Sequence, residues 1–328
     1  MPAHHTPNPN NPPVDSPSIL VVGSGAVGGF YGGKLAKAGA RVTTVQRSDF
    51  EVVRQQGIAI ESIDGDFHFT PHEVLRSPGE CKTPPDYLLV TLKSLPELDI
   101  PTLIRPAAGP GTVIVLMQNG IDIEEPVARA FPDNPLISAL AFVCVQRIAP
   151  GRIRHLCFGR VTIGLYPSGP SAAVGRLERL FRAGGIPCQV TEQPRTARWA
   201  KLVWNAAFNP VSVLAGHATT TEMLAMPECE QLITEVMKEV VSVARLAGHE
   251  LPESTVEENL RATRRMEPYL TSMALDHMAN RPLESEAILG AAIRHGERLG
   301  VPTPCLSGLY AMLTLLTRKR PGESETTV

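Results

Sequence analysis

The residues best suited to chemistry lie in one short stretch of the second half of the chain. Lys201, Asn205 and Asn209 are spaced four residues apart, so on a helix they form one polar stripe. The residues between them are almost all apolar, which predicts a largely buried helix. A buried lysine beside two asparagines costs free energy unless something pairs with it. The stripe is therefore either a structural polar network between helices or part of an active site.

The active-site interpretation points to the reduction of a carbonyl group. Such a reduction places a hydride on carbon and a proton on the developing alkoxide, and a lysine ammonium supplies that proton while stabilising the charge. Burial lowers the pKa of a lysine towards neutrality, where proton transfer is most useful. Asparagine amides hold a hydroxyl or carboxylate without adding charge. We therefore predict that the stripe faces a nicotinamide and that Lys201 donates the proton.

A glycine-rich motif near the start of the chain predicts where that nucleotide binds. The segment Gly23-Ser24-Gly25-Ala26-Val27-Gly28 matches G-x-G-x-x-G. It directly follows an apolar run at 19–22 and opens a predicted helix, the context that distinguishes a dinucleotide site from a flexible loop. The glycines permit a tight turn, backbone approach to a pyrophosphate, and close packing of helix on strand. All six residues are predicted to bind cofactor.

The end of the second predicted strand indicates which nucleotide is bound. An NAD site normally presents a carboxylate to the ribose there, whereas this chain has Arg47. A guanidinium holds a 2′-phosphate through charge-assisted hydrogen bonds, so we predict NADPH. Asp49, two residues later, is the alternative as a ribose ligand, and Arg47 would then be a solvated surface residue.

Two further polar residues follow predicted strands. Lys93 ends the run at 86–92, and Asn119 follows the run at 112–117. Ligands of open α/β sheets bind beyond the carboxyl ends of strands, so both are candidates for the site. Taken singly, they also fit a surface lysine and an Asn-Gly turn.

The pattern of apolar residues predicts an N-terminal Rossmann-like, doubly wound α/β domain followed by an all-helical domain. The predicted parts are a disordered tail at 1–17, an NADP-binding domain at 18–192, a helical substrate and catalytic domain at 193–320, and a frayed tail at 321–328. Predicted strands cover 19–22, 41–45, 86–92, 112–117, 136–145 and 160–165, with helices at 123–131 and 172–183. Apolar residues recur at helical spacing through 196–208, 222–247, 255–279, 283–299 and 305–317.

Composition limits the partners. The net charge of −2 gives no reason to expect nucleic acid or an anionic membrane, and no apolar run is long enough to span a bilayer. The chain begins without the apolar stretch of a signal peptide. Its scattered cysteines predict reduced, mostly buried thiols in the cytoplasm and no metal site. The six are Cys81, Cys144, Cys157, Cys188, Cys229 and Cys305.

Together these segments resemble a known family. The motifs GSGAVG, TLKS, QNG, AKLVWNAAFNP, TSMALD and RPLESEAILG, in this order and spacing, look like ketopantoate reductase, also called 2-dehydropantoate 2-reductase. The resemblance runs from about 18 to 317. It implies NADPH-dependent reduction of 2-dehydropantoate to pantoate, as in pantothenate and coenzyme A biosynthesis.

The resemblance also implies a role for individual residues. Lys201 is similar to the catalytic proton donor, and Glu284 to a glutamate that interacts with cofactor and with the polar groups of the active site. We expect the Glu284 carboxylate to keep Lys201 charged. The remaining assignments are Asn205, Asn209 and Ser272 as substrate ligands, Asn119 as a ligand of cofactor and substrate, and Lys93 as a cofactor ligand.

Several positions depart from the family pattern, and they leave the substrate open. Leu283 stands where a polar threonine is usual, Ser285-Glu286 where Ile-Asp is usual, and Leu289 where asparagine is usual. These changes favour a paralogue that reduces another 2-oxo acid over a change of reaction type. A protein that binds NADPH without turnover is the alternative from another class. The number of subunits is open, with a homodimer as one form.

Overall fold

The computed structural model describes residues 16–318 and divides the chain into two compact units. The first unit contains residues up to Lys93, together with Asp99–Gln118 and Glu124–Pro194. The second contains Ser94–Leu98, Asn119–Ile123 and the chain from Arg195 onward. The frayed tail expected at 321–328, and all but the last two residues of the expected tail at 1–17, lie outside the described residues.

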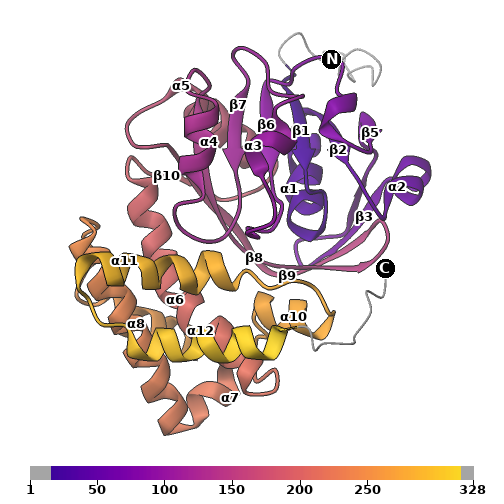
Figure 1. Cartoon of the computed structure of the whole chain (residues 1–328). Helices are drawn as coiled ribbons and strands as arrows, with labels where there is room; N and C mark the ends of the chain where they lie inside the picture. Colours follow the sequence, from indigo (N-terminus) through magenta and orange to yellow (C-terminus); the bar gives the residue numbers. More distant parts are fainter. Residues whose placement is uncertain (1–15, 319–328) are drawn as a thin grey trace, which may run out of the picture. The chain divides into compact units, whose positions relative to one another are not determined.

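The first unit is built on one sheet of ten strands with helices packed against it, shown in indigo to magenta in Figure 1. Its strands are β1 (Ser18–Val22), β2 (Arg41–Val45), β3 (Ile58–Ser62), β4 (Phe67–Phe69), β5 (Glu73–Leu75), β6 (Tyr87–Val90), β7 (Val113–Leu116), β8 (Leu136–Ala149), β9 (Arg152–Leu165) and β10 (Cys188–Val190). Its helices are α1 (Ala26–Lys37), α2 (Phe50–Gln56), the 3-10 turn η1 (Pro78–Glu80), α3 (Ile100–Ile104), α4 (Glu124–Ala130) and α5 (Ala172–Ala183).

The strand order is β4-β3-β9-β8-β7-β6-β1-β2-β5, with β10 beside β9. All neighbours from β8 through β7, β6, β1 and β2 to β5 run parallel. Parallel strands are covered on both faces, which explains why β1, β6 and β7 read as continuous apolar runs. Ile19 and Val21 pack with α1 and α5, while Leu20 points to the opposite face and is equally buried. The predicted Rossmann-like α/β class is confirmed.

The largest difference from the predicted elements is a long antiparallel hairpin. Strands β8 and β9 have 14 residues each, whereas the sequence predicted 136–145 and 160–165. Half of the hairpin is exposed on one face, so its apolar residues alternate with arginines and other polar side chains. That alternation is the signal of a half-buried strand. Strands β4, β5 and β10 were also missed, because three residues are too few to show a period. Strand β3 and helix α2 were missed as well.

The hairpin corrects the expectation that every thiol is reduced. Cys144 on β8 lies opposite Cys157 on β9, and the two form a disulfide. The sequence concealed this pair because the cysteines face each other only in a hairpin that had not been predicted. Of the four free thiols only Cys188 is buried, so the expectation of mostly buried thiols was also wrong.

The second unit is helical, as predicted. Its elements are α6 (Pro194–Leu214), α7 (Thr220–Ala225), α8 (Pro227–Leu246), α9 (Thr255–Arg264), α10 (Ser272–Met278), a π-helical turn η2 (Glu286–Gly290), α11 (Ala291–Leu299) and α12 (Pro304–Thr317). The apolar pattern expected at 222–247 is two helices, because Pro227 lacks a backbone N–H and fits the first turn of a helix, so it starts α8. The pattern expected at 255–279 likewise divides into α9 and α10.

A core of its own holds the second unit together. Residues of α6, among them Val203, Ala206 and Phe208, are fully buried against α8, where Val236 and Val240 are equally buried. In the part of the chain that the structure describes, we find no helix with the length and apolarity needed to cross a membrane.

Candidate active site

The glycine-rich loop has the geometry that a bound pyrophosphate requires. Gly23 has φ +98°, and a Cβ there would lie 2.7 Å from the backbone nitrogen of Leu92. A Cβ on Gly28 would lie 2.6 Å from the carbonyl oxygen of Gly23, so only glycine lets α1 pack this closely. A Cβ on Gly25 would meet no atom within 4 Å, which leaves the start of α1 open to a ligand. The open backbone at a helix N-terminus fits an anionic phosphate.

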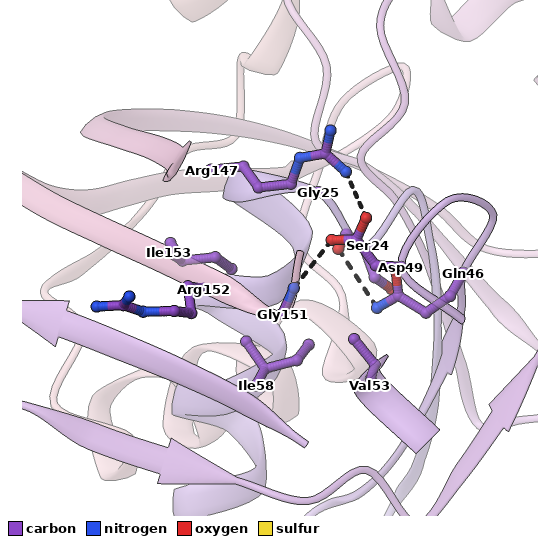
Figure 2. A pocket seen from close by; sticks show the side chains of 10 residues that line it. All are labelled: Ser24, Gly25, Gln46, Asp49, Val53, Ile58, Arg147, Gly151, Arg152 and Ile153. Carbon is purple, nitrogen blue, oxygen red and sulfur yellow. Dashed lines mark hydrogen bonds and ion pairs between the residues drawn. The ribbon is translucent and has the colours of Figure 1, made fainter. Parts of the chain in front are cut away.

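Beside this loop the chain carries two arginines and one acid. Arg47 is exposed at the end of β2, whereas Asp49 is buried at the start of α2. Figure 2 shows Asp49 in a small pocket with Arg147 of β8 and the turn residue Gly151. The Asp49 carboxylate accepts hydrogen bonds from Arg147 Nη1 at 2.5 Å and from the Gly151 backbone nitrogen at 3.1 Å. The Asp49 carboxylate is thus already hydrogen-bonded to other residues of the first unit.

The polar stripe predicted on α6 lies in the second unit and is largely buried. Lys201 is half-buried, while Asn205 and Asn209 are 9% and 1% exposed. The side-chain oxygen of Asn209 is buried without a hydrogen-bond partner among residues 16–318. A buried polar atom of this kind needs an explanation, and a ligand is one.

A chain of hydrogen bonds joins Lys201 to Glu284 through Asn119. Lys201 Nζ donates to Asn119 Oδ1 at 3.0 Å, and Asn119 Nδ2 donates to Glu284 Oε2 at 3.0 Å. The other oxygen of Glu284 accepts from the Ser94 backbone nitrogen at 3.0 Å, and Ser94 Oγ donates to the Asn119 carbonyl at 2.8 Å. All four residues belong to the second unit. Both functional groups of the Asn119 amide are therefore fixed in orientation.

The surroundings of Lys201 make its amine unusually acidic. The pKa of Lys201 lies at about 8, below its ordinary 10.5, chiefly because burial disfavours the charged amine and next because the neighbouring Arg198 guanidinium repels it. The Glu284 carboxylate acts in the opposite direction and raises the pKa. Desolvation is the largest of these effects, so the amine is poised to release a proton near neutral pH.

The segment Asn119–Ile123 is shaped to hold Asn119 in place. Gly120 has φ +100°, and a Cβ there would lie 2.7 Å from the Cβ of Ala287. Arg198 Nη1 donates to the Gly120 carbonyl at 3.3 Å. Asp122, also at positive φ, accepts from His295 of α11 at 2.7 Å. These contacts anchor the residues that follow Asn119 to the helices of the second unit.

The positions after Glu284 form a π-helical turn, a feature that often marks functional sites. Glu284 is 8% exposed, whereas Leu289 is fully buried in the helical core and Leu283 packs against that core. The departure at Leu289 is therefore accommodated in the packing of the unit.

The predicted residue Ser272 does not join the hydrogen-bonded network. Ser272 is exposed at the start of α10, where Thr271 caps the helix, and within the described residues no hydrogen bond links Ser272 to Asn119, Lys201 or Glu284. Lys93 is half-buried after β6 and belongs, with the glycine-rich loop, to the first unit. In residues 16–318 no group of three or more acidic, histidine or cysteine side chains could hold a metal ion.

Sequence reasoning missed three contributors to the site. Ser94 was visible only as the last letter of TLKS, and Arg198 only as a charge near the stripe. Asp122 and His295 are 173 residues apart, so no local pattern in the sequence predicts that they pair.

Comparison with known proteins gives a consistent result. Residues 19–168 match the family described as ketopantoate reductase PanE/ApbA, and residues 194–317 match the C-terminal region of the same family. The 2-dehydropantoate 2-reductase of Nostoc sp. is 36% identical over 92% of this chain and 96% of its own.

Two solved structures extend the likeness to the fold. The 2-dehydropantoate 2-reductase of Methylococcus capsulatus is 47% identical, with a TM-score of 0.86 over 93% of this chain and 99% of that one. The 2-dehydropantoate 2-reductase of Geobacter metallireducens is 33% identical, with a TM-score of 0.87 over 92% of this chain and 100% of that one. The two family matches together, and each of the three relatives alone, cover the sheet-bearing and the helical parts of the chain. The chain is an oxidoreductase that belongs to the ketopantoate reductase family.

Proposed function

We propose that the protein reduces 2-dehydropantoate to pantoate with NADPH, as in pantothenate biosynthesis, and that Lys201 is the proton donor. The observation that carries this proposal is the Lys201 amine, oriented by Asn119 and lowered in pKa to about 8. An amine used only for packing needs neither feature. A nucleotide-binding protein without turnover would have no use for such a group.

The first unit supplies the residues for the phosphates of the cofactor. The backbone at Ser24–Gly28 binds the pyrophosphate, with Gly23 making the turn, and the exposed Arg47 binds the 2′-phosphate. Bound NADPH supplies the hydride. Lys93, Asn119 and Glu284 are assigned to the nicotinamide end.

In the second unit Lys201 performs the proton transfer. Its ammonium donates a hydrogen bond to the carbonyl oxygen of the 2-oxo acid and stabilises the negative charge that develops there. The proton then passes from Nζ to that oxygen, which gives the 2-hydroxy acid. Asn119 fixes the direction of Nζ, and the Glu284 charge keeps the amine protonated before the reaction.

Three residues are assigned to the substrate. The Asn209 side-chain oxygen is buried without a partner, so a donor on the substrate, such as a hydroxyl, would satisfy it. Asn205 lies one turn earlier on the same face of α6. Ser272 is exposed at the start of a helix and offers a hydroxyl to the substrate carboxylate.

The test is the absorbance of NADPH in the presence of the full chain and a panel of 2-oxo acids. We expect 2-dehydropantoate to be the best substrate by kcat/KM. Faster turnover of another branched or larger oxo acid would replace the substrate but keep the reaction. No consumption with any oxo acid would reject the enzyme proposal in favour of a nucleotide-binding protein.

The cofactor assignment has its own test. Arg47→Glu places a carboxylate where an NAD site carries one, and it should move the preference from NADPH to NADH. Unchanged selectivity would refute the role of Arg47. We further infer a cytoplasmic location, where NADPH is available, and a homodimer, which light scattering measures.

A further inference from the structure

The acid nearest the glycine-rich loop is bound so completely that it cannot act as an ordinary ribose ligand. Asp49 is 5% exposed. One of its carboxylate oxygens accepts from Arg147 Nη1 at 2.5 Å and from Ser48 Oγ at 2.8 Å, and the other accepts from the Gly151 backbone nitrogen at 3.1 Å. A carboxylate with these three donors is held in place on both sides.

Arg147 has donors left over after this pairing. Only its Nη1 is used, by Asp49 and by Ser48 Oγ at 2.9 Å, and its side chain is 40% exposed. Within residues 16–318 neither Nε nor Nη2 of Arg147 has a hydrogen-bond partner. Arg147 and Gly25 line the same pocket as Ser24 and Gln46 (Figure 2). Gln46 immediately precedes Arg47, so this pocket lies where β2 ends next to the loop.

Arg147 decides the net charge at this place, because the other arginine that lines the pocket, Arg152, forms an ion pair with Glu61. Arg47 and Asp49, two residues apart, carry opposite charges that offset one another. A phosphate monoester carries about −1.5 to −2 at neutral pH, and an unpaired buried carboxylate nearby would repel it. Arg147 neutralises Asp49 and restores a net positive charge at the end of β2.

We propose that Arg147 is a second determinant of NADPH selectivity, which donates to the 2′-phosphate opposite Arg47, and that Asp49 is a positioning residue that holds the Arg147 guanidinium beside the loop. The acid that follows β2 thus supports the 2′-phosphate site by orienting a cation from the distant hairpin. This inference rests on the proposed use of NADPH. If the Arg147–Asp49 ion pair only held α2 against β8, Arg147 would have no effect on nucleotide selectivity.

Isothermal titration of the full chain with NADP⁺ and with NAD⁺ tests the assignment. Arg147→Gln should weaken NADP⁺ about tenfold, the scale of one charge-assisted hydrogen bond, and should leave NAD⁺ within about twofold. Arg154→Gln is the matched control, because it removes the same charge from the same hairpin, where Arg154 pairs with Glu61 on β3. The control should leave both affinities unchanged.

A second variant controls for misfolding, because Arg147→Gln leaves the buried Asp49 carboxylate without its cation and could destabilise the protein. Asp49→Asn keeps an acceptor for the Gly151 nitrogen, so the double variant Asp49→Asn/Arg147→Gln contains no unpaired charge. Relative to Asp49→Asn alone, the double variant should also lose about tenfold in NADP⁺ affinity.

The outcomes separate this inference from the proposed function. A wild type that prefers NADP⁺, combined with Arg147 variants that weaken both nucleotides equally or neither, overturns the role of Arg147 alone. A wild type without preference for NADP⁺ overturns both the NADPH assignment and this inference. A loss confined to NADP⁺ in both Arg147 backgrounds supports it.

Discussion

Replacing the proposed proton donor by an apolar residue should make the helical unit more stable. Burial, with the nearby Arg198 charge, lowers the pKa of Lys201 from 10.5 to about 8, so at neutral pH the fold bears the cost of a charged amine. At about 1.4 kcal/mol for each tenfold change in proton affinity, that cost is about 3 kcal/mol. Lys201→Met removes it, at the expense of the Asn119 hydrogen bond, worth about 1 kcal/mol. The expected gain at pH 7 is therefore about 2 kcal/mol.

The pH dependence follows from the sign of the shift. Between about pH 8 and 10.5 the unfolded wild type binds more protons than the folded one, so its stability rises with pH through that window. Below pH 8 both states are protonated and the cost is fully present. About 2 kcal/mol of the cost should be gone by pH 9.5. The advantage of Lys201→Met should accordingly be largest at pH 7 and nearly absent at pH 9.5.

Urea unfolding followed by tryptophan fluorescence measures this difference. The two tryptophans of the chain, Trp199 and Trp204, both lie on α6, so their emission reports the helical unit that contains Lys201. The free energies of unfolding of wild type and variant are compared at pH 7 and pH 9.5. A variant that is less stable than wild type at pH 7, or a difference that does not change with pH, would refute the account of Lys201 as a desolvated cation.

Three further predictions concern the neighbours of Lys201. Glu284→Gln removes the negative charge that raises the pKa of Lys201, so the alkaline fall of kcat for reduction should move to lower pH; an unmoved pH–rate profile would contradict this. Asn209→Ala removes a buried, unpartnered oxygen, so it should raise the KM for the oxo acid about tenfold or more without lowering stability or altering the Kd of NADP⁺, as measured by kinetics and calorimetry. Gly120→Ala forces a side chain into a left-handed backbone position and against Ala287, so it should destabilise the helical unit by about 2–4 kcal/mol in urea unfolding; wild-type stability would show that the segment is not held as described.

The parallel core of the sheet was predictable because burial on both faces leaves continuous apolar runs such as ILVV at 19–22. The long hairpin was not, because β9 is exposed on one face and its arginines interrupt the apolar signal. The disulfide between Cys144 and Cys157 was missed for the same reason, since it depends on the register of that hairpin.

The candidate site also has a part that the sequence predicts and a part that it does not. The stripe at Lys201, Asn205 and Asn209 was predictable, because helical spacing alone puts the three residues on one face. The bridge from Lys201 through Asn119 to Glu284 was not, because it joins residues 82 and 165 positions apart. Asp49 illustrates the limit most clearly. Its position after β2 suggested a ribose ligand, but its partner Arg147 lies 98 residues away.

The most direct test of the central claim is the turnover of Lys201→Ala with 2-dehydropantoate and NADPH. If the Lys201 ammonium donates the proton, kcat should fall by roughly 10²–10⁴-fold, while the Kd of NADPH measured by calorimetry stays within about twofold of wild type. Turnover near the wild-type rate, with NADPH bound normally, would contradict the role of Lys201 as proton donor.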